Sequence, residues 1–134
     1  MMRLRALVTF VLLFGLLGPF TVAAEAPSVS LEIVASKRAF TPETLTLLKG
    51  EPATLSIRND DEDLHAFVPL LLLQRTNVQV SGNGAPEFNE AGFVRVLIPP
   101  HGRVELRFTP KTAGTFHYIC DLPGHSMRAQ IVVK

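Results

Sequence analysis

Short runs in which apolar and polar residues alternate recur along most of this chain. These runs stand at 29–33, 44–47, 54–57, 103–108 and 115–120, and a further apolar run closes the chain at 129–134. Alternation puts successive side chains on opposite faces of a strand, so each run predicts a strand with one buried face. No segment has a convincing amphipathic helical period. The chain is therefore expected to be all-β.

Turn signals separate the expected strands. Clusters of Gly, Pro, Asn and Asp occur at 49–52, 59–63, 99–102 and 110–114. These residues supply the backbone angles and local hydrogen bonds that tight turns need. Many short strands at such spacing, in a chain of 134 residues, predict one β-sandwich domain.

The segment 69–98 fits this pattern less well. Its run of four Leu at 70–73 lacks alternation and suits either a buried strand or a helical turn, whereas 81–86 reads as a loop and 92–98 as a further strand. We expect an irregular insertion with partial order. An extra hairpin or crossover packed on the sandwich is the favoured interpretation, and a flap that covers a ligand or docks a partner is the alternative.

The first residues have the pattern of a cleaved secretory signal peptide over 1–24. Arg3 and Arg5 form a basic head, an apolar stretch follows at 6–17, and small residues close the segment at 22–24. The alternative is an uncut membrane anchor, but the apolar stretch is short against the roughly 20 residues that span a bilayer. We therefore expect export, to the periplasm or the extracellular space.

The mature chain is then expected to comprise a linker at 25–28 and a single domain at 29–134, with no integral membrane segment. The formal net charge is +1, and signal removal takes away two Arg and no acid. So weak a charge favours neither nucleic acid nor a strongly charged partner. We expect a monomer.

The eight residues "CDLPGHSM" at 120–127 concentrate chemistry found almost nowhere else in the chain. They hold the single Cys, Cys120, and Met127, the one Met outside the first two residues, together with His125. One Cys cannot form an internal disulfide in an oxidising compartment. Cys120 is therefore an intermolecular bridge, a free thiol or a metal ligand.

Strand parity places Cys120 on the inside of the sandwich. Phe116, Tyr118 and Cys120 alternate along one run, and the two aromatic rings mark that face as buried. A Pro-Gly pair then allows a sharp turn that brings His125 back beside the Cys. A thiolate and an imidazole in this arrangement suit copper or zinc, and they also suit a Cys–His nucleophile pair.

The metal interpretation needs a second imidazole, and His65 is the best candidate among four His. His65 shares a strand face with Phe67, which should point inward, and a buried His without a partner is costly. His101 stands in a turn and His117 is out of phase with Cys120, so both are read as surface residues. The resulting ligand set, His65, Cys120, His125 and Met127, has the donors of a blue-copper site.

Two stretches carry a resemblance to a known family: "NDDEDLHAF" at 59–67 and "FTPKTAGTFHYICDLPGH" at 108–125. The chain resembles the cupredoxins, small blue copper proteins of the plastocyanin, azurin and amicyanin kind, over about 29–134. The resemblance implies a Greek-key β-sandwich with one type 1 copper ion at one end. It also implies one-electron transfer between larger redox partner proteins, with the second His, His125, as the exit for the electron.

One feature departs from the family pattern. The axial Met usually lies three or more residues beyond the second His, whereas Met127 is only two beyond His125. Met127 is thus either the axial ligand or a core residue. In the second case the axial position is empty, or a backbone oxygen or a group from 69–98 approaches it.

The sequence also bears on rival functions. A periplasmic copper carrier or resistance protein could use the same ligands without transferring electrons. An enzyme is disfavoured, because the chain has no His-x-His pair and no second Cys in the loop, and because Asp121 is badly placed to orient His125. A metal-free binding sandwich would leave the Cys and the inward His unexplained. The expected function is an electron carrier and not an enzyme.

Overall fold

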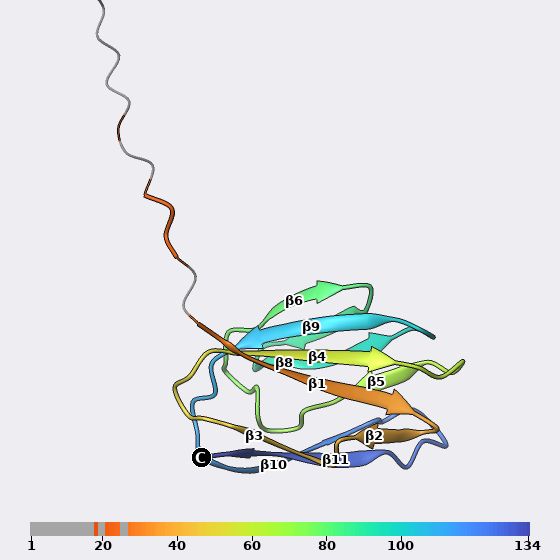
Figure 1. Cartoon of the computed structure of the whole chain (residues 1–134). Helices are drawn as coiled ribbons and strands as arrows, with labels where there is room; N and C mark the ends of the chain where they lie inside the picture. Colours follow the sequence, from red (N-terminus) through yellow and green to blue (C-terminus); the bar gives the residue numbers. More distant parts are fainter. Residues whose placement is uncertain (1–17, 19–20, 25–26) are drawn as a thin grey trace, which may run out of the picture.

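The computed structural model describes residues 18, 21–24 and 27–134; most of the predicted signal peptide lies outside these residues. In the described part the regular elements are eleven strands and no helix (Figure 1). The strands are β1 (Val29–Ser36), β2 (Ala39–Thr41), β3 (Thr44–Leu47), β4 (Ala53–Asn59), β5 (His65–Phe67), β6 (Gln79–Gly82), β7 (Ala85–Asn89), β8 (Gly92–Ile98), β9 (Arg103–Phe108), β10 (Gly114–Ile119) and β11 (Arg128–Val133).

One layer of the sandwich is a five-stranded sheet in the order β2-β1-β4-β9-β6. β1 and β4 run parallel, with Val29 opposite Ala53 and Ala35 opposite Asn59. β9 is antiparallel to both of its neighbours. Since the chain must cross to the other layer between parallel neighbours, strands close in sequence are split between layers, as the predicted sandwich requires.

The second layer is built from two three-stranded sheets, β10-β11-β3 and β5-β8-β7. An isolated antiparallel bridge joins them, because Val68 and Ile119 exchange two backbone hydrogen bonds of 3.0 and 3.1 Å. This bridge lies directly beyond β5 and at the end of β10. It therefore sets the His65 strand against the strand that leads into Cys120.

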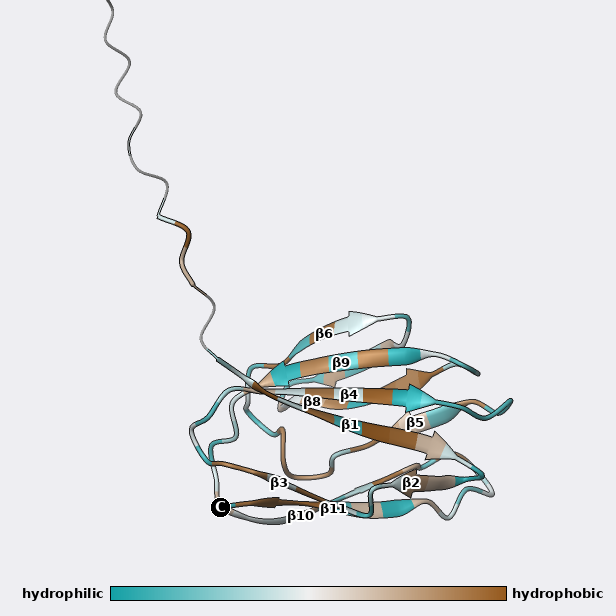
Figure 2. Ribbon diagram, viewed as in Figure 1, coloured by the Kyte–Doolittle hydropathy of each residue, from teal (hydrophilic) through white to brown (hydrophobic). Residues whose placement is uncertain are grey.

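The core fills the space between the layers. Strands of both layers alternate hydrophobic and hydrophilic positions (Figure 2), as expected of sheets with one face in water. Tyr118 and Phe67 are the largest fully buried side chains, and their ring centroids lie 5.1 Å apart. Each stands two residues from a candidate ligand, so these buried rings support the strands that carry the site.

The segment 69–98 is more regular than expected. The four Leu form turns, with a hydrogen bond from Leu72 N–H to the Pro69 carbonyl, and 92–98 is the predicted strand. The loop predicted at 81–86 is wrong, because its ends belong to β6 and β7 and only 83–84 connect them. Propensity misled here because both strands are short, lie at sheet edges and bury little apolar surface.

Candidate metal centre

His65 opens β5 and is fully buried. Its strand pairs with β8, where His65 lies opposite Ile98, so the ring is held inside the sandwich and not on a loop. The ring nitrogens face in different directions. Nδ1 lies 3.1 Å from Nδ1 of His125, and Nε2 lies 2.8 Å from Oδ2 of Asp61. The predicted inward orientation is confirmed.

Cys120 follows the last residue of β10 and is 3% exposed. The loop beyond it is closed by the Cys120 N–H, which donates to the Met127 carbonyl at 3.1 Å, and by the His125 N–H, which donates to the Leu122 carbonyl at 3.1 Å. Gly124 has φ 78°, a left-handed conformation that favours Gly. This backbone path returns His125 to Cys120, as the Pro-Gly pair predicted.

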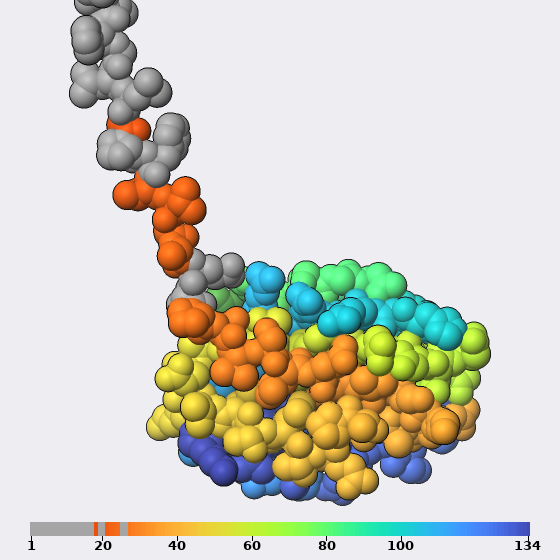
Figure 3. All heavy atoms as spheres, viewed as in Figure 1, coloured from red at the N-terminus to blue at the C-terminus, as the bar shows by residue number. Residues whose placement is uncertain are grey.

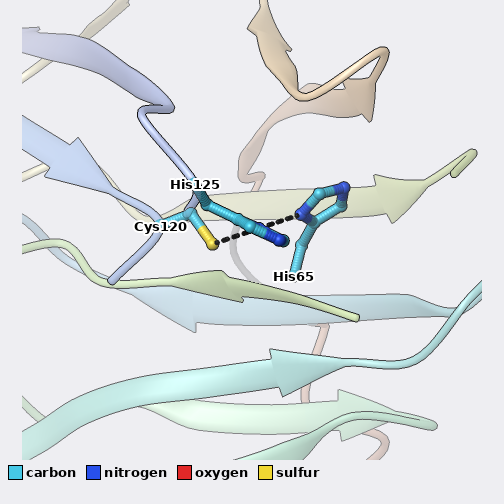
Figure 4. A group of neighbouring side chains, drawn as sticks. All are labelled: His65, Cys120 and His125. Atoms are coloured by element: carbon cyan, nitrogen blue, oxygen red, sulfur yellow. Dashed lines mark hydrogen bonds between the residues drawn. The ribbon is translucent and has the colours of Figure 1, made fainter. Parts of the chain in front are cut away.

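The three side chains converge at one end of the sandwich (Figure 4). One nitrogen or sulfur atom from each of His65, Cys120 and His125 lies within 4.8 Å of the other two. Cys120 Sγ is 3.4 Å from His125 Nδ1, and the two imidazole rings meet edge to face with centroids 5.0 Å apart. His125 is the partly exposed member of this group, which we call the candidate metal centre.

The sulfur of Cys120 has a backbone donor of its own. The Ala66 N–H donates to Sγ at 3.3 Å, and both residues are buried. A donor at this position stabilises negative charge on the sulfur, as a thiolate ligand requires. This donor comes from β5, across the bridge between the two sheets of the second layer.

Met127 stands immediately before β11 and is 3% exposed. It shares inward parity with the buried residues Ala129, Ile131 and Val133. The short loop therefore leaves its side chain on the core side of the sheet, in the same buried cluster as Cys120.

Charged residues near the centre form partnerships that the sequence did not predict. Arg95 on β8 donates to both carboxylate oxygens of Asp121, at 3.0 and 2.9 Å, and to both of Glu87 on β7, at 2.8 and 3.0 Å. This clamp ties the start of the loop to the neighbouring sheet. It also lowers the pKa of Glu87 through the hydrogen bond from Arg95. Asp121 thus pairs with Arg95, while His125 Nδ1 faces Cys120 and His65.

The remaining imidazoles lie outside the candidate metal centre. His101 sits in the predicted turn, with a 61% exposed side chain, and pairs with Glu62 at 2.8 Å. His117 lies on β10, out of phase with Cys120 as predicted. The partner that sequence reasoning missed is Asp61. It lies in an acidic run that was read only as a turn, and its position four residues before His65 was the available signal.

The chain matches a known protein family. The family model described as the cupredoxin-like domain covers residues 6–133. This chain is a member of the cupredoxin-like family. No curated protein sequence matches it.

Solved structures share the cupredoxin fold at low sequence identity. Auracyanin A of Chloroflexus aurantiacus, described as a blue copper protein, is 23% identical, with a TM-score of 0.59 over 81% of this chain and 100% of that one. Auracyanin of Roseiflexus castenholzii is 19% identical, with a TM-score of 0.59 over 80% and 98%. A Cu(I) amicyanin variant is 16% identical, with a TM-score of 0.52 over 78% and 82%. At such identities the likeness establishes the fold.

Within this cupredoxin-like chain, the structure therefore brings together three of the four residues that were predicted as ligands. The fourth, Met127, is buried in the hydrophobic core that also contains Cys120, and its carbonyl accepts the Cys120 N–H. Among the described residues, no helix is long and apolar enough to cross a membrane.

Proposed function

We propose that this protein is a one-electron carrier with a single type 1 copper ion, which His65, Cys120, His125 and Met127 would hold. The observation that carries the proposal is the convergence of one imidazole from β5 with one thiol and one imidazole from the loop after β10. Two imidazoles, a thiolate and a weak thioether are the donors of blue-copper sites.

The spacing of the donor atoms supports a shared ion. Nitrogen and sulfur ligands bind one ion at about 2.0–2.3 Å, so two ligand atoms of a shared ion would lie no more than roughly 4.6 Å apart. The His65–His125 and Cys120–His125 separations are 3.1 and 3.4 Å, which is within this limit. His125 lies in the middle of the loop between β10 and β11, so its ring could adjust while β5 and β10 stay in place. The residues therefore fit the ion without rearrangement of the strands.

The protein residues have separate parts in this function. Bound copper supplies the couple between Cu(II) and Cu(I). The Ala66 N–H favours the thiolate form of Cys120, and the full burial of His65 keeps water from that side. Because His65 lies on β5 and Cys120 directly follows β10, these two ligands should change position little between oxidation states. The partly exposed His125 is the ligand that a redox partner can approach.

The organisation of the chain is part of the same proposal. Residues 1–24 act as a signal peptide, 25–28 as a linker and 29–134 as the copper domain. The protein works outside the cytoplasm as a monomer that exchanges electrons with larger redox proteins. It does not act as an enzyme. The pattern of the first residues supports export, and the near-neutral charge favours neither nucleic acid nor a strongly charged partner.

Titration of the purified mature protein with Cu(II) under visible spectroscopy tests the proposal. We expect an intense blue absorption that saturates at one copper per chain, bleaches with a reductant and returns on reoxidation. Cys120→Ser should abolish the band. His117→Ala is the matched control, since this imidazole lies near in sequence but outside the candidate metal centre, and it should leave the band unchanged.

Other outcomes would redirect the proposal. Binding of Cu(I) without a stable Cu(II) form would refute electron transfer and favour a copper carrier or resistance protein. A stable site with an altered, green spectrum would retain the three strong ligands and remove Met127 from the axial position. No binding of either ion would leave a metal-free sandwich.

A further inference from the structure

The outer nitrogen of His65 faces a carboxylate. Nε2 lies 2.8 Å from Oδ2 of Asp61, with His65 fully buried and the Asp61 side chain only 18% exposed. An ionised carboxylate can only accept, so Nε2 carries the proton and donates. In the neutral imidazole this leaves the lone pair of His65 on Nδ1, the nitrogen that faces His125.

The carboxylate of Asp61 is itself held firmly. The Lys37 N–H donates to Oδ1 at 2.7 Å, and the Arg38 N–H donates to Oδ2 at 3.0 Å. On its own backbone, the Asp61 N–H donates to Oδ1 of Asn59 at 2.9 Å. Two backbone N–H groups and the His65 ring thus hold the Asp61 carboxylate in one orientation.

The hairpin that supplies these donors is unusual in its backbone. Lys37 and Arg38, between β1 and β2, both have left-handed conformations, with φ of 53° and 56°. Side chains disfavour this region, but two successive residues there aim both N–H groups at one anion. Figure 3 shows this orange hairpin abutting the yellow-green turn after β4 at one end of the domain.

A second carboxylate on the same turn provides a natural comparison. Asp63 accepts from the guanidinium of Arg38 at 2.8 and 3.1 Å, and its side chain is 49% exposed. It carries the same charge as Asp61 and stands two residues from His65. Its carboxylate pairs with Arg38, so Asp63 has the charge and the location of Asp61 but a different partner from His65.

We propose that Asp61 is a positioning residue of the metal centre, whose fixed carboxylate selects the Nδ1-ligating form of His65 and favours Cu(II) over Cu(I). The inference rests on the proposed function. A negative charge one hydrogen bond from a ligand stabilises the more highly charged ion more strongly. Partners of this kind orient ligating imidazoles and raise their basicity, and their loss typically weakens metal binding by about 10–100-fold.

The test compares Asp61→Asn with Asp63→Asn, which remove the same charge from the same turn. Cu(II) affinity is measured by competition titration, and the reduction potential by spectroelectrochemistry. In Asp61→Asn, we expect Cu(II) affinity to fall by about 10–100-fold. A tenfold loss of Cu(II) affinity relative to Cu(I) affinity raises the reduction potential by about 59 mV for one electron. Asp63→Asn should shift the reduction potential far less.

Equal shifts in the two variants, or none in Asp61→Asn while its blue band persists, would overturn the inference. Urea unfolding of both apo variants separates the metal effect from stability, since a purely structural role would lower the unfolding midpoint and leave the potential unchanged.

Nitrogen NMR of the apo protein reads the His65 tautomer directly, so the inference is decided even if the chain takes up no copper and the proposed function fails. We expect the proton on Nε2 in the wild type and a mixed population in Asp61→Ala. The same single tautomer in both proteins would refute the positioning role, whatever the fate of the copper proposal.

Discussion

Asn59 is the buried polar residue whose loss should most damage the end of the sandwich that carries the metal centre. Its side chain is fully buried at the end of β4. Nδ2 donates to the carbonyls of Asp63, Ile98 and Pro99, at 2.8, 3.1 and 3.1 Å, and Oδ1 accepts the N–H of Asp61. One amide therefore joins the turn before His65 to the end of β8.

The expected effect of Asn59→Ala follows from these four hydrogen bonds. The Ile98 carbonyl bond is wholly buried, and a buried group left unsatisfied costs about 1–3 kcal/mol. Nδ2 has two N–H groups for three carbonyls, so the three partly buried contacts together count as about two further bonds, each contributing about 0.5–1 kcal/mol because water replaces part of them. We expect the free energy of unfolding to fall by about 2–5 kcal/mol in total, a large share of the roughly 5–15 kcal/mol typical of a domain.

Urea unfolding of the metal-free protein measures this loss without interference from copper. At an m-value of about 1.5 kcal/mol/M, the midpoint should fall by about 1–3 M. Asn83→Ala is the control, because its Oδ1 accepts the Arg103 N–H at an exposed site, and it should cost less than about 1 kcal/mol. Equal losses in the two variants would refute the argument that burial of the Asn59 network sets its contribution.

Three further predictions test other parts of the structure. Because Arg95 holds the folded-state pKa of Glu87 below its usual value of 4.5, this pair stabilises the fold at neutral pH, and the stabilisation is lost as pH falls through that lowered pKa. Between neutral and acidic pH, the urea midpoint should therefore fall further in the wild type than in Glu87→Gln, and equal falls would contradict the pairing. Burial raises the pKa of Tyr118, the single Tyr of the chain, so tyrosinate absorbance should titrate well above about 10 in the folded protein and near 10 in urea. A folded-state midpoint near 10 would show that the ring is not buried. Gly82 has φ 102°, and a Cβ added there would meet the backbone of β9, so Gly82→Ala should lower the free energy of unfolding by about 1–3 kcal/mol in the urea assay. An unchanged free energy of unfolding would mean that β6 and β9 do not approach so closely at Gly82.

Alternation along the chain was sufficient to predict the main strands. The runs at 29–33, 54–57 and 103–108 became β1, β4 and β9, because each buries one complete face against the second layer. β2 and the pair β6 and β7 escaped prediction. They are three to five residues long and mostly exposed, so tertiary pairing and not local pattern holds them.

The candidate ligands were accessible to the same reasoning. Parity along 116–120 placed Cys120 inside, the Pro-Gly pair returned His125 to it, and the inward position of His65 followed from Phe67. What parity could not supply was the distance between His65 and Cys120, which are 55 residues apart in the sequence. That distance depends on the bridge between Val68 and Ile119, a pairing that leaves no mark in either local sequence.

The sequence by itself thus determined the all-β class, the loop that carries Cys120 and His125, and the inward face of each. These properties depend on side-chain alternation and on residues adjacent in the chain. Only the tertiary structure decided that Asp61 contacts Nε2 of His65, that the hairpin between β1 and β2 donates to the Asp61 carboxylate, and that Arg95 pairs with Asp121. The contacts of Lys37 with Asp61 and of Arg95 with Asp121 join segments more than 20 residues apart, and the contact of Asp61 with His65 depends on the path of the turn between them. Hydrogen bonds of this kind follow no sequence period and are set when the strands and turns pack together.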